Sequence, residues 1–124
     1  MTMTVPIGYG VQLSADMALI GILGESTTYT LAIANSGNTA DTFDLSASSI
    51  WPATLSHSSV TLAANASKIF SVAVDIPAGA VDGSFDVATI TATSRSDAAA
   101  TDSADLKTTA AEWLRTYLPI TIKN

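Results

Sequence analysis

The stretch of sequence that decides the fold is STTYTLAIANSGNTADTFDL, residues 26–45. Apolar residues alternate with small or polar ones in both of its halves, a period of two that is typical of strands with one buried face. Between the halves stands the cluster Asn-Ser-Gly-Asn at 35–38, which predicts a turn in which Gly37 can take a positive φ at no steric cost. We therefore expect strands over 26–35 and 41–48. The side chains that share the predicted buried face are Tyr29, Leu31, Ile33, Phe43, Leu45 and Ala47.

The same alternation recurs on both sides of this unit. Its clearest instance is KIFSVAVDI, residues 68–76, which ends at Pro77 because proline cannot donate to a sheet ladder. Residues 84–94 form a further strand whose apolar phase changes between Val87 and Ile90, which predicts a β-bulge near Ala88. Shorter strands are expected at 11–15, 53–57, 59–63 and 101–109, and residues 17–23 could continue the first of them across a kink at Gly21 and Gly24.

This pattern indicates an all-β domain. Seven or eight short strands with turn signals about every ten residues are typical of an Ig-like antiparallel β-sandwich. We place the domain at residues 7–109 and treat 110–124 as a C-terminal apolar tail. The tail combines helical spacing of Trp113, Leu114, Tyr117 and Leu118 with strand-like alternation further on, so a helix, a strand and a disordered segment all stay open.

Composition excludes several classes of function. The net charge of −6 and the pI of about 4.2 argue against a nucleic-acid partner. The absence of cysteine excludes disulfides, thiolate zinc sites and cysteine nucleophiles. The single histidine makes a multi-histidine metal site improbable, and the longest apolar run, residues 17–23, is too short to span a membrane as a helix. We therefore expect no enzyme, no cofactor and no metal.

Acidic residues provide the strongest candidates for a metal site. Asp41 and Asp44 are three apart in a strand, so their side chains point to opposite faces and cannot easily share one ion. Asp75, Asp82 and Asp86 flank one loop, and calcium is held by oxygen ligands of this kind. The sequence lacks EF-hand spacing, however, and we expect these acids to be solvated side chains that keep sheet edges unpaired.

A histidine and several aromatic residues provide further candidates. His57 lies among Ser56, Ser58 and Ser59, but neighbours on a strand point apart, and a catalytic pair needs a third orienting group. We expect His57 to be a surface or edge residue. Tyr29 and Trp51 are predicted to belong to the core. A sugar-binding platform could then use only the aromatic residues near the chain ends, Tyr9, Trp113 and Tyr117.

Three stretches resemble bacterial immunoglobulin-like accessory domains. They are YTLAIANSGNTADTFDL (29–45), LSHSSVTLAANAS after Trp51 (55–67) and VDIPAGAVDGSFDVATITATS (74–94). The resemblance covers about residues 11–109 and is to the NPCBM-associated domain of α-galactosidases and the cell-adhesion-related (CARDB) domain. It implies an Ig-like sandwich appended to secreted or surface proteins as a non-catalytic spacer or adhesion module. No catalytic residue is implied.

The sequence therefore predicts a structural spacer or interaction module of an exported or cell-surface bacterial protein. Its expected partners are neighbouring domains of a larger polypeptide. A polysaccharide or cell-wall ligand is the alternative. The ending RTYLPITIKN resembles Tyr-Leu-Pro-aliphatic tails of some secreted bacterial proteins, which implies an export or surface-association feature. We expect the tail either to pack along the sandwich or to mediate self-association, because exposed apolar patches tend to find partners.

Overall fold

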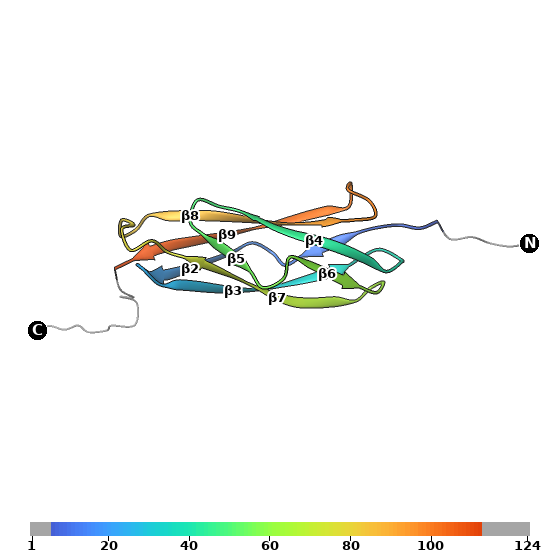
Figure 1. The fold of residues 1–124 in the computed structure, drawn as a ribbon, viewed down its shortest axis with the longest axis horizontal. Coiled ribbons are helices and arrows are strands. Elements are labelled where there is room, and N and C mark those ends of the chain that lie inside the picture. The colour runs from blue at the N-terminus through green and yellow to red at the C-terminus, as the bar shows by residue number, and fades with distance from the viewer. Residues whose placement is uncertain (1–5, 113–124) are drawn as a thin grey trace, which may run out of the picture.

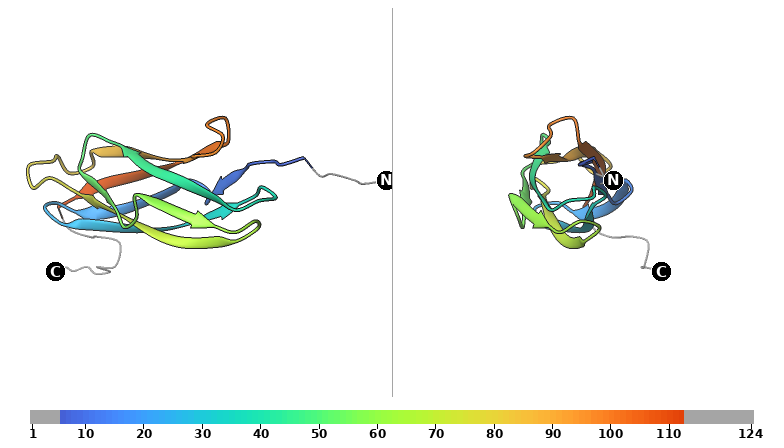
Figure 2. Two further views of the ribbon diagram at one scale, coloured as in Figure 1. Left: turned by 45° about the vertical axis from the view of Figure 1, so that its right-hand side comes forward. Right: turned by 90° about the vertical axis from the view of Figure 1, so that its right-hand side faces the viewer.

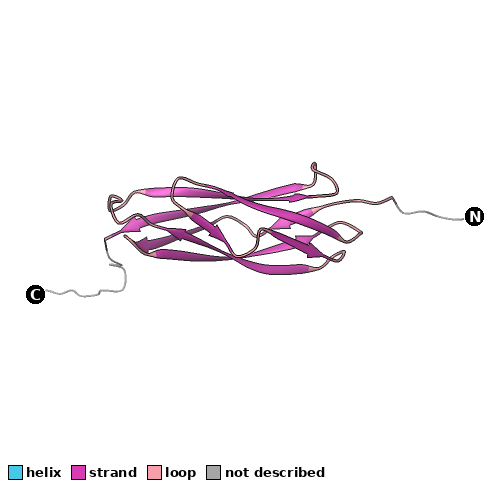
Figure 3. Ribbon diagram, viewed as in Figure 1, coloured by secondary structure: helices cyan, strands magenta, loops and turns pink. Residues whose placement is uncertain are grey.

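The structure, a computed structural model, describes residues 6–112. Every regular element in this range is a strand (Figure 3). No helix long and apolar enough to cross a membrane occurs between these residues. The strands, in chain order in Figure 1, are β1 (Val11–Leu13), β2 (Met17–Ile22), β3 (Ser26–Asn35), β4 (Asp41–Ser48), β5 (Ala53–Leu55), β6 (Ser59–Leu62), β7 (Ser67–Asp75), β8 (Phe85–Ser94) and β9 (Thr101–Ala111).

The strands form two sheets that pack face to face. One sheet has the order β1-β3-β7-β5 and the other the order β2-β9-β8-β4-β6. Seen along its long axis, the molecule is a ring of strands around one core (Figure 2). The predicted all-β, Ig-like sandwich is confirmed in class. It has nine strands within the described residues, because the apolar N-terminal stretch makes two separate strands.

Period-two alternation places the core between the sheets. The inward side chains of β3 and β7 come from one sheet, and those of β4, β8 and β9 come from the other. Tyr29 is 1% exposed, and its hydroxyl lies 2.7 Å from the Lys107 carbonyl and 2.8 Å from the Thr108 hydroxyl, which joins the two sheets. The largest fully buried apolar side chains are Tyr29, Phe43, Phe70, Leu31, Ile33, Ile76, Ile90, Leu106, Val72 and Val74.

The N-terminal strands belong to different sheets. β1 pairs antiparallel with β3, whereas β2 pairs parallel with β9. Two carboxylates hold the crossing segment: Asp102 accepts from the Leu13 N–H at 2.7 Å, and Asp16 accepts from the Asp105 N–H at 2.9 Å. Residues 17–23 therefore do not continue the first strand. They add the only parallel pair within the described residues to an otherwise antiparallel fold.

The predicted bulge near Ala88 is wrong. β8 pairs with β9 in one uninterrupted register from Phe85 to Thr93. The buried phase of the strand is even-numbered throughout: Asp86, Ala88, Ile90, Ala92 and Ser94. Phe85 and Val87 are apolar residues on the solvent face, so apolarity and burial disagree at the start of this strand.

Gly37 is needed for a close contact and does not use the positive φ that glycine allows. Within residues 6–112 the glycines with positive φ are Gly24 and Gly83. A Cβ on Gly37 would lie 2.5 Å from the Gly8 carbonyl oxygen and 3.1 Å from the Gly10 nitrogen. Glycine is needed there because the N-terminal segment runs against the turn backbone.

Candidate functional site

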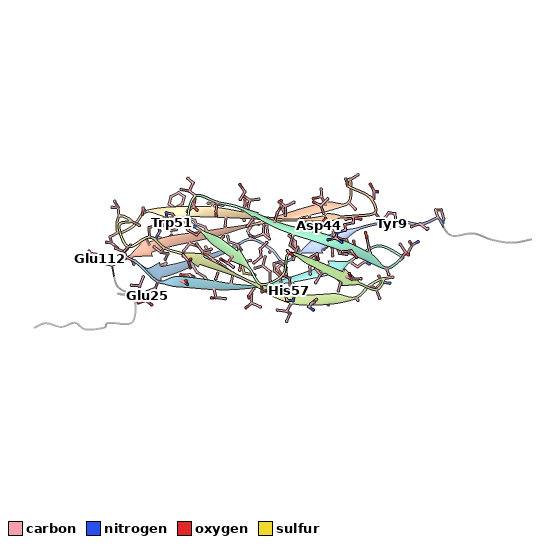
Figure 4. The ribbon with its side chains drawn as sticks, in the orientation of Figure 1. Tyr9, Glu25, Asp44, Trp51, His57 and Glu112 are labelled. Atoms are coloured by element: carbon pink, nitrogen blue, oxygen red, sulfur yellow. The ribbon has the colours of Figure 1, made fainter. Side chains whose placement is uncertain are left out.

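The described chain begins at one end of the long axis of the sandwich and finishes at the other, and the two ends carry different kinds of side chain. The first described residues lie at one end of the long axis, where Tyr9 is found, and Glu112 lies at the opposite end with Glu25 (Figure 4). We call the first the entry end, comprising residues 6–10, 35–41, 63–66 and 94–100. We call the second the exit end, comprising residues 22–25, 49–52, 76–86 and 109–112.

Hydrogen bonds tie the incoming chain to the entry end. The Ser36 N–H donates to the Gly10 carbonyl and the Asn38 N–H to the Gly8 carbonyl, each at 3.0 Å. The Asn38 side chain accepts from the Gly8 N–H and donates to the Pro6 carbonyl, each at 2.8 Å. Residues 6–10 are thus held against the 35–38 turn by hydrogen bonds and extend the sandwich at this end.

The outgoing chain is tied in the same manner at the exit end. The Leu23 N–H donates to the Ala111 carbonyl at 2.9 Å, and the Gly83 N–H donates to the Ala110 carbonyl at 2.7 Å. The Glu112 N–H donates to the Asp82 carboxylate at 3.1 Å. β9 therefore stays paired through Ala111, two residues beyond the predicted end of this strand.

A shallow depression at the entry end contains the most distinctive polar cluster. It has a volume of about 280 Å³ and is lined by Ala40, Asp41, Thr42, Thr61, Arg95 and Ser96. Asp41 is only 6% exposed. Its carboxylate accepts hydrogen bonds from the Ser94 hydroxyl, from the Ser96 hydroxyl at 2.8 Å and from the Thr42 N–H at 2.7 Å.

These contacts decide the charge of Asp41. Desolvation by burial acts to raise the pKa of the carboxyl, but the hydroxyls of Ser94 and Ser96 and the backbone N–H groups of Thr42 and Ser96 outweigh it. The pKa of Asp41 is therefore lowered from its usual range. Asp41 and Asp44 lie on opposite faces of β4, as predicted, and exposed Asp44 pairs with Arg95 at 2.9 Å. The cluster is a set of hydrogen bonds around a charged carboxylate, and it joins β4 to the β8–β9 loop.

The three acids considered for calcium are not brought together. Asp75 accepts from the Ser26 hydroxyl, and Asp82 accepts from Glu112. Asp86 is buried, contrary to the expectation of a solvated acid, and accepts from the Ile50 N–H at 2.9 Å and the Trp51 N–H at 2.8 Å. No group of three metal-ligating side chains occurs within the described part of the chain.

His57 and the aromatic residues lie apart. His57 is half-buried near the middle of the molecule (Figure 4), and the Ser56 hydroxyl lies 3.0 Å from its Nδ1. The two side chains therefore meet, which the expected strand geometry excluded. The Ser56 hydroxyl also accepts from the Ser71 N–H at 2.9 Å, so it serves the β5–β7 connection.

The aromatic side chains of the described range are mostly used in packing. Tyr29 is in the core and Trp51 is half-buried against it, as predicted. Tyr9 is half-buried at the entry end, and Phe85 is the exposed aromatic residue of residues 6–112. Trp113 and Tyr117, the other two residues considered for a sugar platform, lie outside the described residues, as do tail residues Leu114, Leu118, Ile120 and Ile122.

Comparison by sequence finds nothing: no protein-family model and no curated protein matches the chain. Comparison of structures finds PapD-like and Ig-like domains. The chain is similar to a PapD-like (ASH) domain of human CEP192, with a TM-score of 0.64 and 17% identity over 90% of this chain and 92% of that one.

A bacterial glycoside hydrolase and a periplasmic chaperone each contain a similar domain. A family 123 glycoside hydrolase from Clostridium perfringens matches with a TM-score of 0.68 and 9% identity, over 87% of this chain and 28% of that one. The periplasmic chaperone SfaE matches with a TM-score of 0.54 and 13% identity, over 82% of this chain and 57% of that one. The chain thus spans well under two thirds of both proteins. At these identities the likeness establishes the Ig-like fold and nothing further.

Proposed function

We propose that the chain is a non-catalytic spacer or interaction module of an exported or cell-surface bacterial protein, of the kind that NPCBM-associated and CARDB domains represent. One observation carries the proposal: the chain enters at one end of the long axis, leaves at the other, and is hydrogen-bonded to the sandwich at both (Figure 1). This arrangement holds whatever precedes the domain at a fixed distance from whatever follows it.

The parallel pair β2–β9 suits this role mechanically. Both strands run from the entry end to the exit end, paired over six positions from Met17–Leu106 to Ile22–Ala111. Tension on the two chain ends pulls β2 toward the entry end and β9 toward the exit end. The two strands are then sheared, and all the hydrogen bonds between them must yield together. A pair pulled apart from one end would lose its bonds one at a time.

The non-catalytic part of the proposal is supported by the Asp41 cluster. A catalytic carboxylate needs a free oxygen facing a substrate and a pKa suited to proton transfer. The Asp41 oxygens accept from Ser94, Ser96 and Thr42, and its pKa is lowered. Its contacts are those of a structural anion.

The alternative, a carbohydrate- or cell-wall-binding module, receives less support. A stacking platform for sugars needs exposed aromatic faces next to one another. In residues 6–112 the exposed aromatic residue is Phe85, and the Lys107 ammonium lies 4.4 Å above its ring. Retention of the chain on insoluble glycans, lost on substitution of aromatic residues, would favour this alternative over the spacer.

Pulling on single molecules tests the spacer function. The chain has no cysteine, so handles can be attached to introduced ones without side reactions. Ile7→Cys with Glu112→Cys applies force across the two ends, and Glu25→Cys with Glu112→Cys applies it at the exit end alone. We expect a clearly higher unfolding force for the first pair. Equal forces would overturn the shear argument.

The place of the domain in a larger exported protein needs a separate test. An antibody against residues 6–112 is applied to fractionated cells of the source. A band much larger than the 12.7 kDa of this chain, in the medium or envelope, is the expected result. A 12.7 kDa band in the cytosol would overturn the proposal and make a small binding protein the leading hypothesis.

A further inference from the structure

The outer face of the five-stranded sheet carries an apolar patch beside the exit end. Strand register places Ile20, Thr109 and Phe85 in one row across β2, β9 and β8, and Ala18, Lys107 and Val87 in the next. Ile20 is 54%, Phe85 57% and Val87 37% exposed. Neighbouring strands lie about 4.8 Å apart, so these side chains form one surface, which we call the exit patch.

The exit patch continues an unequal distribution of apolar surface. Ile50 and Val81, in two of the loops of the exit end, are 89% and 73% exposed. Near the entry end the exposed large apolar side chains among the described residues are Ile7 and, at the start of β7 on the other sheet, Ile69. Contiguous exposed apolar surface costs free energy in water and marks surfaces that are covered by something else.

The chain itself supplies a matching segment at this place. Residues 113–124, WLRTYLPITIKN, follow Glu112 directly and contain six large apolar residues besides proline. They carry two bases, Arg115 and Lys123, and no acid, whereas residues 1–112 carry eleven acids and three bases. The patch is close to the exposed acids Glu25, Asp82 and Glu112 of the exit end. The apolar surfaces therefore match, and the charges of the segment match the acids beside the patch; the base within the patch, Lys107, lies over the Phe85 ring.

We propose that the exit patch is the docking surface for the C-terminal segment 113–124 of the same chain. Thr109, at the centre of the patch, is three residues before Glu112, so the segment starts about 10 Å away. Twelve residues reach up to about 40 Å when extended, which is ample to turn back over the sheet. Docking would cover Ile20, Phe85 and Val87 and bring Arg115 and Lys123 near the exit-end acids.

Limited trypsin digestion of the full chain, followed by intact mass, tests this inference. Cleavage after Arg115 requires the segment to leave the patch, so its rate follows the undocked population. We expect Phe85→Thr and Ile20→Thr each to speed this cleavage about tenfold or more, the change that loss of one large apolar contact produces. The matched control is Ile69→Thr, which removes an equally exposed side chain from β7 on the opposite sheet.

The oligomeric state decides between one chain and two. Sedimentation over a wide concentration range is expected to give a monomer for the full chain and for each variant. A dimer that dissociates in Phe85→Thr would overturn the proposal in favour of segment exchange between copies. Rapid cleavage after Arg115 in the unsubstituted chain, unchanged by Phe85→Thr, would overturn docking altogether. Neither result bears on the spacer function, which rests on the paired chain ends of residues 6–112.

Discussion

The entry end and the exit end of this sandwich stabilise their loops by different means. The entry end buries polar side chains: Asn35 is 1% and Asp41 6% exposed, and each has several hydrogen-bond partners. The exit end has one buried acid, Asp86, and exposes apolar side chains such as Ile50 and Phe85.

The difference has a functional meaning. Removing one member of a buried hydrogen bond is costly. The remaining partner stays desolvated and has no hydrogen bond to offset the free-energy cost of its desolvation. The entry end is therefore a rigid attachment for the incoming chain. Exposed apolar groups contribute little to the stability of the sandwich but favour contact with a further segment. We therefore expect a further segment to associate with the exit end.

Asn35→Ala, at the entry end, should cause the largest loss of stability. The Asn35 amide donates to the Thr39 carbonyl at 2.9 Å and the Leu62 carbonyl at 3.1 Å and accepts from the Gly37 N–H at 2.9 Å. Removing the amide leaves three groups unpaired, two of them buried and one partly buried, and we expect a loss of about 3 kcal/mol in the free energy of unfolding. Chemical denaturation measures this.

The exposed neighbour Asn38 provides the control for this substitution. Water can replace the bonds that Asn38 makes to Gly8 and Pro6, so Asn38→Ala should cost at most about 1 kcal/mol. If the two variants were equally stable, burial would not be the reason for the rigidity of the entry end.

Asp41→Asn should cost about 2 kcal/mol, because hydrogen bonds to a charged acceptor are stronger than those to a neutral one. The pKa of Asp41 is lowered in the folded state, so its charge stabilises the fold above the unfolded pKa of about 3.9. This stabilisation is lost as the pH falls through the lowered folded pKa.

Unfolding free energies measured between pH 6 and pH 2 check the sign. The gap between the unsubstituted chain and Asp41→Asn should be constant above about pH 5 and shrink below pH 4. Asp44→Asn, which removes an exposed ion pair with Arg95, should change stability by about 0.5 kcal/mol or less at neutral pH. A gap that widens in acid would contradict the lowered pKa.

Asp86→Asn tests the one buried acid of the exit end and should cost about 1.5 kcal/mol. One carboxylate oxygen of Asp86 accepts from both the Ile50 and Trp51 N–H groups, and a neutral amide accepts more weakly. Thermal unfolding, with Asp82→Asn as the exposed control, measures the difference. A larger loss than that of Asp41→Asn would reverse the proposed ranking of the two ends.

Phe85→Thr should have only a small effect on stability, about 1.5 kcal/mol, which is the tenfold change expected for the docking contact, because more than half of the side chain is exposed and threonine suits a strand. The same thermal unfolding measurement checks it. A loss above about 2 kcal/mol would mean that the ring belongs to the core, and the contrast between the two ends would then disappear.

The strands were largely predictable, because burial of one face leaves a period of two in the sequence. Strands β3, β4, β7 and β9 begin and end within two residues of their predicted bounds. The prediction failed where apolar side chains face solvent: Phe85 and Val87 suggested a bulge that the uninterrupted β8–β9 register excludes. Periodicity follows apolarity, and apolarity does not match burial where apolar side chains such as Phe85 and Val87 lie on the solvent face.

The polar sites were less predictable. Asp41, Asp75, Asp82 and Asp86 all stood out as acids, yet the sequence did not distinguish buried acceptors from solvated ones. Asp41 is enclosed by Ser94 and Ser96, more than fifty residues away, and Asp86 binds a loop thirty-five residues away. Only the folding of distant segments onto one another decides such partners.

By itself the sequence determined an all-β, Ig-like sandwich, an acidic surface and the absence of cysteine chemistry, because these follow from local periodicity and composition. Tertiary structure alone decided that β2 joins β9 in parallel, that the chain enters and leaves at opposite ends, and that one end is polar and the other apolar. Strand pairing and the position of an end are long-range properties, and residue alternation along one strand carries no information about its neighbour across the sheet.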